Sequence, residues 1–245
     1  MGMRSLSAAE LIRAWERGWG QSPVDRALTL LAAVSTESLA DLSRLSVGQR
    51  DARLLEIYEQ HFGQTLRAFA ECPECGERLE YSITSRDLAR DRAEHREEPA
   101  IALVVEQMSL RLRPPNSLDL NAVKGCADLA SARRMLAERC IVEAHSGDTL
   151  IDAGALPDAA LERVAECLAK TDPQADVLID LRCPDCGNDW QVIFDIESFL
   201  WAKVTALAKR LLREVHLLAG AYGWAEHDIL MMSAVRREFY LEMVA

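Results

Sequence analysis

Four of the seven cysteines have the spacing of metal ligands, because they form two Cys-Pro-acid-Cys-Gly turns. The first turn contains Cys72 and Cys75, and the second contains Cys183 and Cys186. Two thiolates from one tight turn supply half of a tetrahedral four-sulfur site, and two such turns supply all of it. Proline fixes one φ angle, while glycine tolerates a positive φ and leaves backbone N–H groups free to donate to the sulfurs. The pattern therefore predicts one structural Zn²⁺ ion bound by all four cysteines.

The two turns lie in similar sequence segments, which predicts two matching β-hairpins. When Cys183 is aligned with Cys72, apolar residues coincide at every second position on both flanking segments, without a gap. Alternation with a period of two is typical of strands that bury one face. We therefore expect two hairpins that form the halves of a split zinc ribbon, with a cysteine pair at each tip. The coinciding residues are Leu66, Ala68, Ala70, Leu79, Tyr81 and Ile83 in the first segment and Val177, Ile179, Leu181, Trp190, Val192 and Phe194 in the second.

Two other interpretations of the cysteine pairs stay open. A single CxxC pair can act as a redox centre of thioredoxin type, and each pair can also form a plain disulfide. A catalytic zinc is not favoured, because it needs an open coordination position and no His–Glu pair accompanies either turn. The remaining cysteines, Cys126, Cys140 and Cys167, stand beside apolar residues and are expected to be buried as small hydrophobic side chains.

The sequence contains no set of residues that indicates catalysis. It lacks the glycine-rich phosphate-binding patterns and the nucleophile elbow, and its five histidines form no metal-binding or catalytic pattern. Covalent catalysis requires at least a nucleophile with a base beside it. We therefore expect a protein that is not an enzyme and that has no small-molecule substrate.

The composition is that of a globular protein with an acidic surface. The hydrophobic fraction is 49%, the charged fraction 27% and the formal net charge −11. Proteins that coat nucleic acid are usually basic, because Lys and Arg must neutralise phosphates, so a nucleic-acid partner is not favoured. No apolar run approaches the roughly 20 residues that span a bilayer, and the N-terminus lacks the apolar core of a secretion signal. These features predict a cytoplasmic protein without a membrane partner.

Changes in periodicity divide the chain into three regions and predict a helix-rich α+β fold. Residues 1–63 form an N-terminal helical region with capping boxes at Ser7 and Ser46. Residues 64–195 form the split zinc-ribbon region, interrupted by a helical insertion at about 101–172. Residues 196–245 contain a long helix, whose apolar residues repeat every three or four positions, and two short helices.

Within the middle region, three local predictions can be tested directly. An exposed, charged linker or a loose solvated helix is expected over residues 85–100. The segment VVEQMSLRLR, residues 104–113, is a single strand candidate that ends at two prolines. One helical stretch is expected to begin at Asn116 or Ser117 and to continue through Ala144.

The C-terminal region has two features of a partner-binding surface. Aromatic residues stand close to arginines, which is the usual composition of an interface core, although the aromatic side chains could equally pack on the long helix. The long helix also carries Lys203, Lys209, Arg210 and Arg213, which form either a basic stripe for an acidic partner or a solvated face. The candidate partner-binding residues are Tyr222, Trp224, Arg236, Arg237 and Tyr240.

Several longer segments resemble a known family. They are RCPDCGNDWQVIFDIESFLWAKV, YGWAEHDIL and RREFYLEMV towards the C-terminus, and MSLRLRPPNSLDLNAV and ARRMLAERCIVEA in the middle. Together they resemble the T4-type phage baseplate hub assembly chaperone family over roughly residues 65–245. Because CPxCG pairs do not mark the T4-type members, the resemblance is to zinc-knuckle members encoded with contractile phage tails and phage-like contractile injection systems.

The resemblance implies a non-enzymatic structural or assembly protein of a baseplate. Its partners would then be baseplate, tube or spike proteins of a contractile particle, and the protein could become part of that particle. The alternative from a different class is a zinc-ribbon adaptor that binds nucleic acid or the transcription machinery. The net charge of −11 and the acidic residues beside both cysteine turns count against this alternative.

Overall fold

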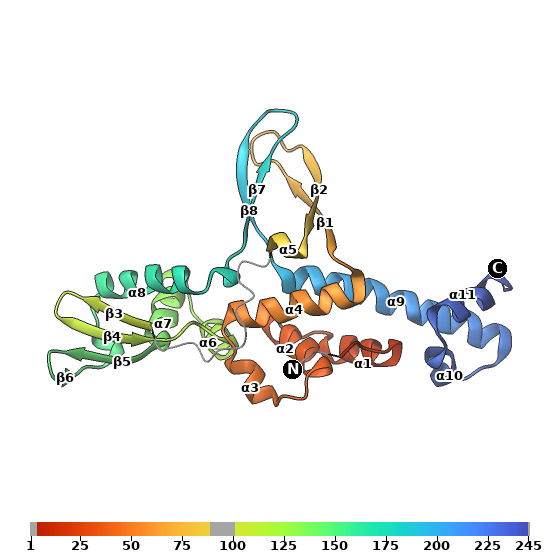
Figure 1. Cartoon of the computed structure of the whole chain (residues 1–245), viewed down its shortest axis with the longest axis horizontal. Coiled ribbons are helices and arrows are strands. Elements are labelled where there is room, and N and C mark those ends of the chain that lie inside the picture. Colours follow the sequence, from red (N-terminus) through yellow and green to blue (C-terminus); the bar gives the residue numbers. More distant parts are fainter. Residues whose placement is uncertain (1–3, 89–100, 245) are drawn as a thin grey trace. The chain divides into compact units, whose positions relative to one another are not determined.

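The computed structural model describes residues 4–88 and 101–244, which form two compact units. The terminal unit consists of Met1–Leu39 and Ile196–Ala245, and the central unit consists of Ala40–Asp195. The fold is α+β and rich in helix, with small antiparallel sheets and a long C-terminal helix, as predicted (Figure 1). The division of the chain into three regions stays a prediction.

The terminal unit is made of helices that pack on one long helix, α9. The two N-terminal helices and the two short C-terminal helices all contact α9. The apolar residues that repeat every three or four positions along α9 face the core of this unit: Leu207 is half-buried, and the buried ones are Leu200, Val204, Leu211, Val215 and Leu218. The helices described in this unit are α1 (Ala8–Gly18), α2 (Pro23–Val34), α9 (Ile196–Tyr222), α10 (Glu226–Met231) and α11 (Ala234–Glu242).

The central unit contains two separate two-stranded hairpins and one four-stranded antiparallel sheet. The hairpins pair β1 (Thr65–Glu71) with β2 (Arg78–Thr84) and β7 (Leu178–Arg182) with β8 (Asp189–Ile193). The sheet, between the hairpins in sequence, has the order β3 (Ile101–Val105), β4 (Met108–Leu112), β5 (Ile141–Ser146) and β6 (Thr149–Leu150). The α-helices are α3 (Leu39–Arg44), α4 (Val47–Phe62), α5 (Ser85–Leu88), α6 (Ser117–Val123), α7 (Leu129–Cys140) and α8 (Asp158–Thr171).

Helices begin where the sequence provides a cap. Ser7 and Glu10 form the predicted capping box of α1, and Ser46 and Gln49 form that of α4. Pro23 occupies the first turn of α2, where its missing N–H costs no hydrogen bond. The segment expected to be exposed is described only at its start, where α5 forms, and there Ser85 and Leu88 are buried rather than exposed. Residues 89–100 lie outside the described residues.

Two local predictions in the insertion were wrong. Residues 104–113 are not one strand, because Glu106 adopts a positive φ of 54° and turns the chain between β3 and β4. The single helix expected through Ala144 is two helices, α6 and α7, with a break over residues 124–128. The second of them ends at Cys140, and the β-branched Ile141 and its neighbours form β5 against β4. The sheet packs with α7 and α8 around a hydrophobic core that includes Leu112, Cys140 and Val164.

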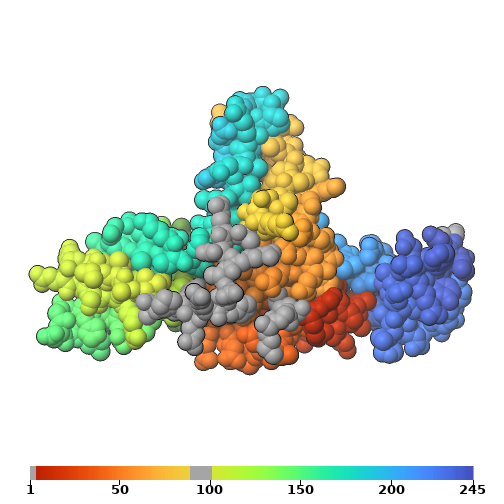
Figure 2. All heavy atoms as spheres, in the orientation of Figure 1, coloured from red at the N-terminus to blue at the C-terminus, as the bar shows by residue number. Residues whose placement is uncertain are grey.

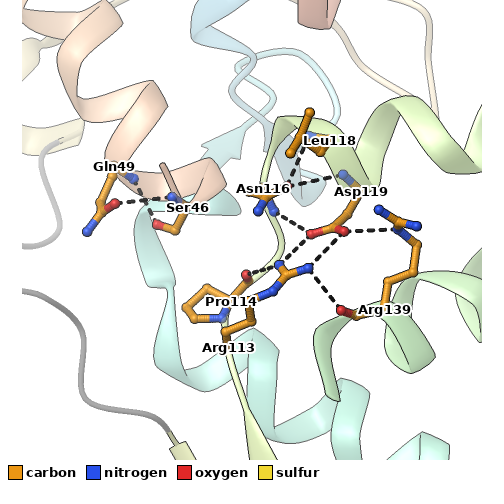
Figure 3. A network of polar contacts seen from close by, with 8 residues as sticks. All are labelled: Ser46, Gln49, Arg113, Pro114, Asn116, Leu118, Asp119 and Arg139. Carbon is orange, nitrogen blue, oxygen red and sulfur yellow. Dashed lines mark hydrogen bonds and ion pairs between the residues drawn. The ribbon is translucent and has the colours of Figure 1, made fainter. Parts of the chain in front are cut away.

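A buried carboxylate at the start of α6 connects the end of β4 with α7 (Figure 3). Asp119 has no exposed side-chain surface, and it accepts two hydrogen bonds from Arg113, at 2.6 and 3.0 Å, and one from Arg139 at 2.9 Å. Burial alone would raise the pKa of Asp119, but the hydrogen bonds from Arg113 and from the Asn116 N–H hold it below its usual value. Asn116 also forms a β-bridge with Ser46, so the network reaches the start of α4.

Candidate metal centre

The tips of the two hairpins bring the four predicted cysteines together, and Figure 2 shows the tips lying against each other. Sγ of Cys72 lies 3.7 Å from Sγ of Cys186, and Sγ of Cys75 lies 3.6 Å from Sγ of Cys183. All four sulfurs lie within 4.8 Å of one another. Zinc–sulfur bonds of about 2.3 Å place the sulfurs of a tetrahedral site about 3.8 Å apart. The sulfurs therefore fit a closed site for a single metal ion.

The two turns have the same backbone structure. In each, the N–H of the first cysteine donates to the carbonyl five residues later, at 2.8 Å in both turns. The glycine N–H donates back to the carbonyl of that cysteine, and Gly76 and Gly187 have φ angles of 76° and 75°. Only glycine adopts this left-handed conformation without strain. The sequence repeat is thus a repeat of backbone geometry that aims two sulfurs from each tip at one point.

The strands below the tips repeat as well. In both hairpins the residues predicted to face inward are more buried than their neighbours in the strand, which confirms the predicted alternation. Ala70 pairs with Leu79 in the first hairpin, and Leu181 pairs with Trp190 in the second. Each of these is the second strand pair from the cysteine turn. The cysteines therefore follow the last strand pair at the same position in both hairpins.

The environment differs between the cysteines of one turn. Cys72 and Cys183 are buried, whereas Cys75 and Cys186 are exposed. Burial raises the pKa of Cys72, but backbone N–H groups of Cys75 and Glu74 and the facing sulfur lower it to about 7. The N–H of Glu77 lowers the pKa of Cys75, but desolvation and the three neighbouring sulfurs raise it to about 12. Four sulfurs at this distance cannot all be thiolates unless a cation compensates their charge.

The other cysteines lie apart from this centre. Cys140 is buried, as predicted, whereas Cys126 and Cys167 are half-buried. Burial raises the pKa of Cys140 to about 12, so its thiol stays protonated at neutral pH. Among the described residues, the four cysteines of the two tips form the one group with the spacing of a metal site.

The candidate partner-binding residues also come together, in the terminal unit. The rings of Tyr222 and Trp224 stack with centroids 4.4 Å apart, and Tyr240 contacts both edge-on. The guanidinium group of Arg236 lies 5.7 Å from the Tyr240 ring, whereas Arg237 is buried and donates to Glu214 at 2.8 Å. Most of these contacts are made within the cluster, and its role towards a partner stays a prediction.

Comparison with known proteins identifies the family of this chain. The sequence model of the T4 bacteriophage base plate protein family matches residues 24–201. The chain belongs to this family. The match includes both cysteine turns and the whole insertion between them. It begins before residue 65, where the resemblance noted in the sequence begins, and it ends before the segments YGWAEHDIL and RREFYLEMV. No curated protein and no solved structure matches the chain.

Membership in this family confirms the coarser part of the sequence interpretation. The family consists of structural proteins of the baseplate, which are generally not enzymes, and it implies baseplate proteins as partners. In the part of the chain that the structure describes, every helix, including α9, is too short or too polar to cross a bilayer.

One surface feature was missed by sequence reasoning. Val235, Phe239 and Met243 follow one another at every fourth position along α11 and are 65%, 61% and 68% exposed. Their spacing is a signal of one helix face, and it was available in the sequence. Phe239 belongs to the C-terminal aromatic residues noted in the sequence, whereas Val235 and Met243 were not singled out, so the apolar face as a whole was not predicted.

Proposed function

We propose that this protein is a non-enzymatic structural or assembly protein of the baseplate of a contractile phage-like tail or injection system. The match of residues 24–201 to the baseplate family carries the proposal. The zinc-knuckle hairpins support the finer assignment, to the relatives of hub assembly chaperones that are encoded with such particles. Its partners are baseplate, tube or spike proteins of the particle.

We further propose that the four cysteines bind one structural Zn²⁺ ion, with the ligands Cys72, Cys75, Cys183 and Cys186. Four thiolates around one point are typical of zinc or of iron–sulfur clusters, and four sulfurs that all lie within 4.8 Å of one another suit a single ion. The two short sulfur–sulfur contacts join cysteines of different hairpins: Cys75 and Cys183 are 108 positions apart in the sequence, and Cys72 and Cys186 are 114 apart. Bound zinc would therefore hold the two hairpins at a fixed angle and keep the insertion in a closed loop.

Metal analysis of the purified full-length chain tests the ion. We expect one zinc ion per chain by mass spectrometry, and no reaction of the four cysteines with a thiol reagent until a chelator removes the metal. A protein that contains a disulfide within one CxxC pair and less than half a zinc ion would contradict the zinc site. That result would revive the redox interpretation of the pairs.

Affinity purification from the native host tests the functional class. The tagged protein should recover sheath, tube, spike or baseplate proteins, identified by mass spectrometry. Recovery of polymerase subunits, ribosomal proteins or nucleic acid would instead support the zinc-ribbon adaptor and contradict the baseplate proposal. Assembled particles, sedimented and probed with an antibody, separate two roles: a structural component stays with the particle, and an assembly chaperone does not.

The cluster Tyr222, Trp224, Arg236, Arg237 and Tyr240 supports a partner-binding surface at the C-terminal end of the terminal unit. The stacked rings and the buried Arg237 fix α11 on α9, and α11 then presents exposed apolar side chains. Exposed apolar side chains next to arginine and tyrosine are typical of binding surfaces.

The variants Arg236→Glu and Phe239→Asp test this surface. Both side chains are exposed, so we expect folding to be retained and co-purification of baseplate proteins to be lost. The control is Arg163→Glu on α8, which reverses one exposed charge outside this surface. Undiminished co-purification by both surface variants would show that the partner binds elsewhere.

A further inference from the structure

A groove in the terminal unit combines tryptophan side chains with cations. Its volume is about 810 Å³, within the range of ligand-binding clefts, and it lies along one face of α9 beside the turn that follows α1. Trp19 and Trp201 line it together with Arg26, Lys209 and Arg213. Among the residues that the structure describes, no acidic one lines the groove, although the chain has a net charge of −11. Three cations are thus concentrated on an otherwise acidic protein.

These cations differ from the other basic residues of α9. Arg210 lies 3.4 Å from Glu214, and the ammonium group of Lys203 lies over the Phe199 ring. By contrast, Lys209 and Arg213, one helical turn apart, form no ion pair within the described residues. The basic stripe considered from the sequence therefore separates into residues with an intramolecular partner and residues that line the groove.

Arg26 provides a second observation. Its guanidinium group lies 5.0 Å from the centre of the Trp201 ring, and its buried Nε has no hydrogen-bond partner in the described part of the chain. Thr205, which also lines the groove, has a buried hydroxyl in the same condition. A buried donor without a partner costs free energy that a bound hydrogen-bond acceptor would recover.

The aromatic side of the groove is preformed. Gly18 allows the Trp201 indole to lie against α1, since a Cβ atom at this position would be 2.4 Å from a ring carbon. Trp19 contacts Trp15 edge-on, with ring centroids 5.1 Å apart, yet is 62% exposed. Rings that are held in place before binding lose little conformational entropy when a ligand covers them.

We propose that this groove binds an acidic segment of a partner protein. Carboxylates would pair with Lys209 and Arg213, and with the Arg26 side chain, while an apolar side chain of the segment covers the exposed face of Trp19. The inference rests on the proposed function only for the identity of the protein that carries the segment. The three cations and the two tryptophan side chains of the groove define the chemistry of the segment that it binds.

A protein segment fits the groove better than nucleic acid does. Binding along a phosphate backbone needs rows of cations, and the net charge of −11 opposes the approach of a long polyanion. A short segment meets only the three local cations. Small side chains on α9, Ala202 and Ala206, leave room beside them for a peptide backbone.

The test uses the full-length protein and a displayed library of random short peptides as the probe. Peptides are selected on the wild-type protein and counter-selected on the double variant Lys209→Glu/Arg213→Glu. We expect the recovered peptides to be rich in Asp and Glu and to contain at least one large apolar residue. The best of them, made synthetically, should bind about tenfold or more weakly to the double variant and to Trp19→Ala, and more weakly at high salt.

The matched control is Arg163→Glu/Lys170→Glu on α8, which changes the net charge equally outside the groove and should bind the peptide as the wild type does. Recovery of only neutral or basic peptides, or equal binding to all variants, would overturn the proposal. Displacement of the peptide by a single-stranded DNA oligonucleotide at lower concentration would assign the groove to nucleic acid instead. Because no baseplate protein takes part, the result is independent of the affinity purification from the host.

Discussion

At the scale of single residues, we expect the folding of the insertion to depend on one buried carboxylate, that of Asp119. Asp119 receives hydrogen bonds from two arginines that stand at the end of β4 and in α7, and it is completely buried. A buried charge that loses its partner is left with its desolvation cost uncompensated. The residues of this network are therefore expected to matter more for folding than the exposed ion pairs do.

The variant Asp119→Asn tests that expectation. It removes the buried charge, so Arg113 and Arg139 lose their charge-assisted hydrogen bonds, and we expect the free energy of unfolding to fall by about 1.5–3 kcal/mol. Urea denaturation followed by circular dichroism measures the change. In the control, Glu143→Gln, the exposed pair with Arg111 is lost, at a cost of no more than about 1 kcal/mol. Equal losses for the two variants would contradict the assigned importance of the network.

A second carboxylate makes stability depend on pH. Burial raises the pKa of Asp51, and the negative charges of Asp195 and Asp172 add to this effect. The positive charge of Arg50 and its hydrogen bond lower the pKa, and the net value is about 6. The folded state therefore keeps its proton at a pH where the unfolded state has lost it. The contribution of Asp51 to stability is fully present below about pH 4 and is lost as the pH rises to about 6.

Comparison with Asp51→Asn isolates this effect. We expect the unfolding free energy of the wild type, relative to the variant, to fall by about 3 kcal/mol at most between pH 4 and pH 6. Denaturation of both proteins across this range measures it, and the comparison cancels the pH dependence of the metal site, which both share. A constant difference would show that Asp51 has an ordinary pKa.

At the scale of elements, each hairpin presents two sulfurs and neither completes a site alone. The registers of β1 with β2 and of β7 with β8 place the cysteine turns at corresponding positions. Closing the site joins thiols 108 positions apart, and restraint of so long a loop removes much conformational freedom from the unfolded chain. The metal is therefore expected to stabilise the whole central unit.

The variant Cys183→Ser tests this coupling. We expect it to lose zinc and to aggregate or unfold, because the remaining three ligands cannot close the loop firmly. The matched control is Cys167→Ala, which removes a half-buried thiol outside the site and should keep its zinc. Zinc content and thermal unfolding are measured for both proteins. A Cys183→Ser protein that is natively folded with a full complement of zinc would refute the role of this cysteine.

The comparison between sequence and structure is also clearest for the elements. The hairpins, the capped helices and the cysteine cluster could be predicted, because each has a local signal that repeats or caps. The turn at Glu106 could not, since it has no glycine or asparagine where the backbone turns left-handed. Strand β5 was missed because its stability comes from pairing with β4, a contact with a distant part of the chain.

The groove and the Asp119 network show the same limit. Their residues come from several elements, and the sequence gives no indication that Arg26 lies near Lys209 or that Asp119 meets Arg139. Only the packing of helices determines which charges become buried together. The family, in contrast, was recognisable from short segments, because a family resemblance does not require knowledge of contacts.

At the scale of the whole molecule, the central unit contains all four cysteines of the candidate metal centre and a core of its own. We expect a fragment of residues 40–195 to fold alone and to bind one zinc ion. Metal analysis and the cooperativity of thermal unfolding test this. A fragment that is unfolded in the presence of zinc, while the full chain is folded, would show that the unit depends on the terminal helices.

The separation of the two cysteine pairs along the chain also sets the order of events during synthesis. Ribosomes add roughly 5–20 residues per second, so the second turn is made roughly 5–20 s after the first. During this interval the nascent chain contains only the first cysteine pair, Cys72 and Cys75, which is half of the predicted site. A translation arrest, or a premature stop codon, within the insertion would leave reactive thiols without their counterparts. The first cysteine pair is therefore open to oxidation or to a wrong metal for these seconds, until the second turn can complete the site.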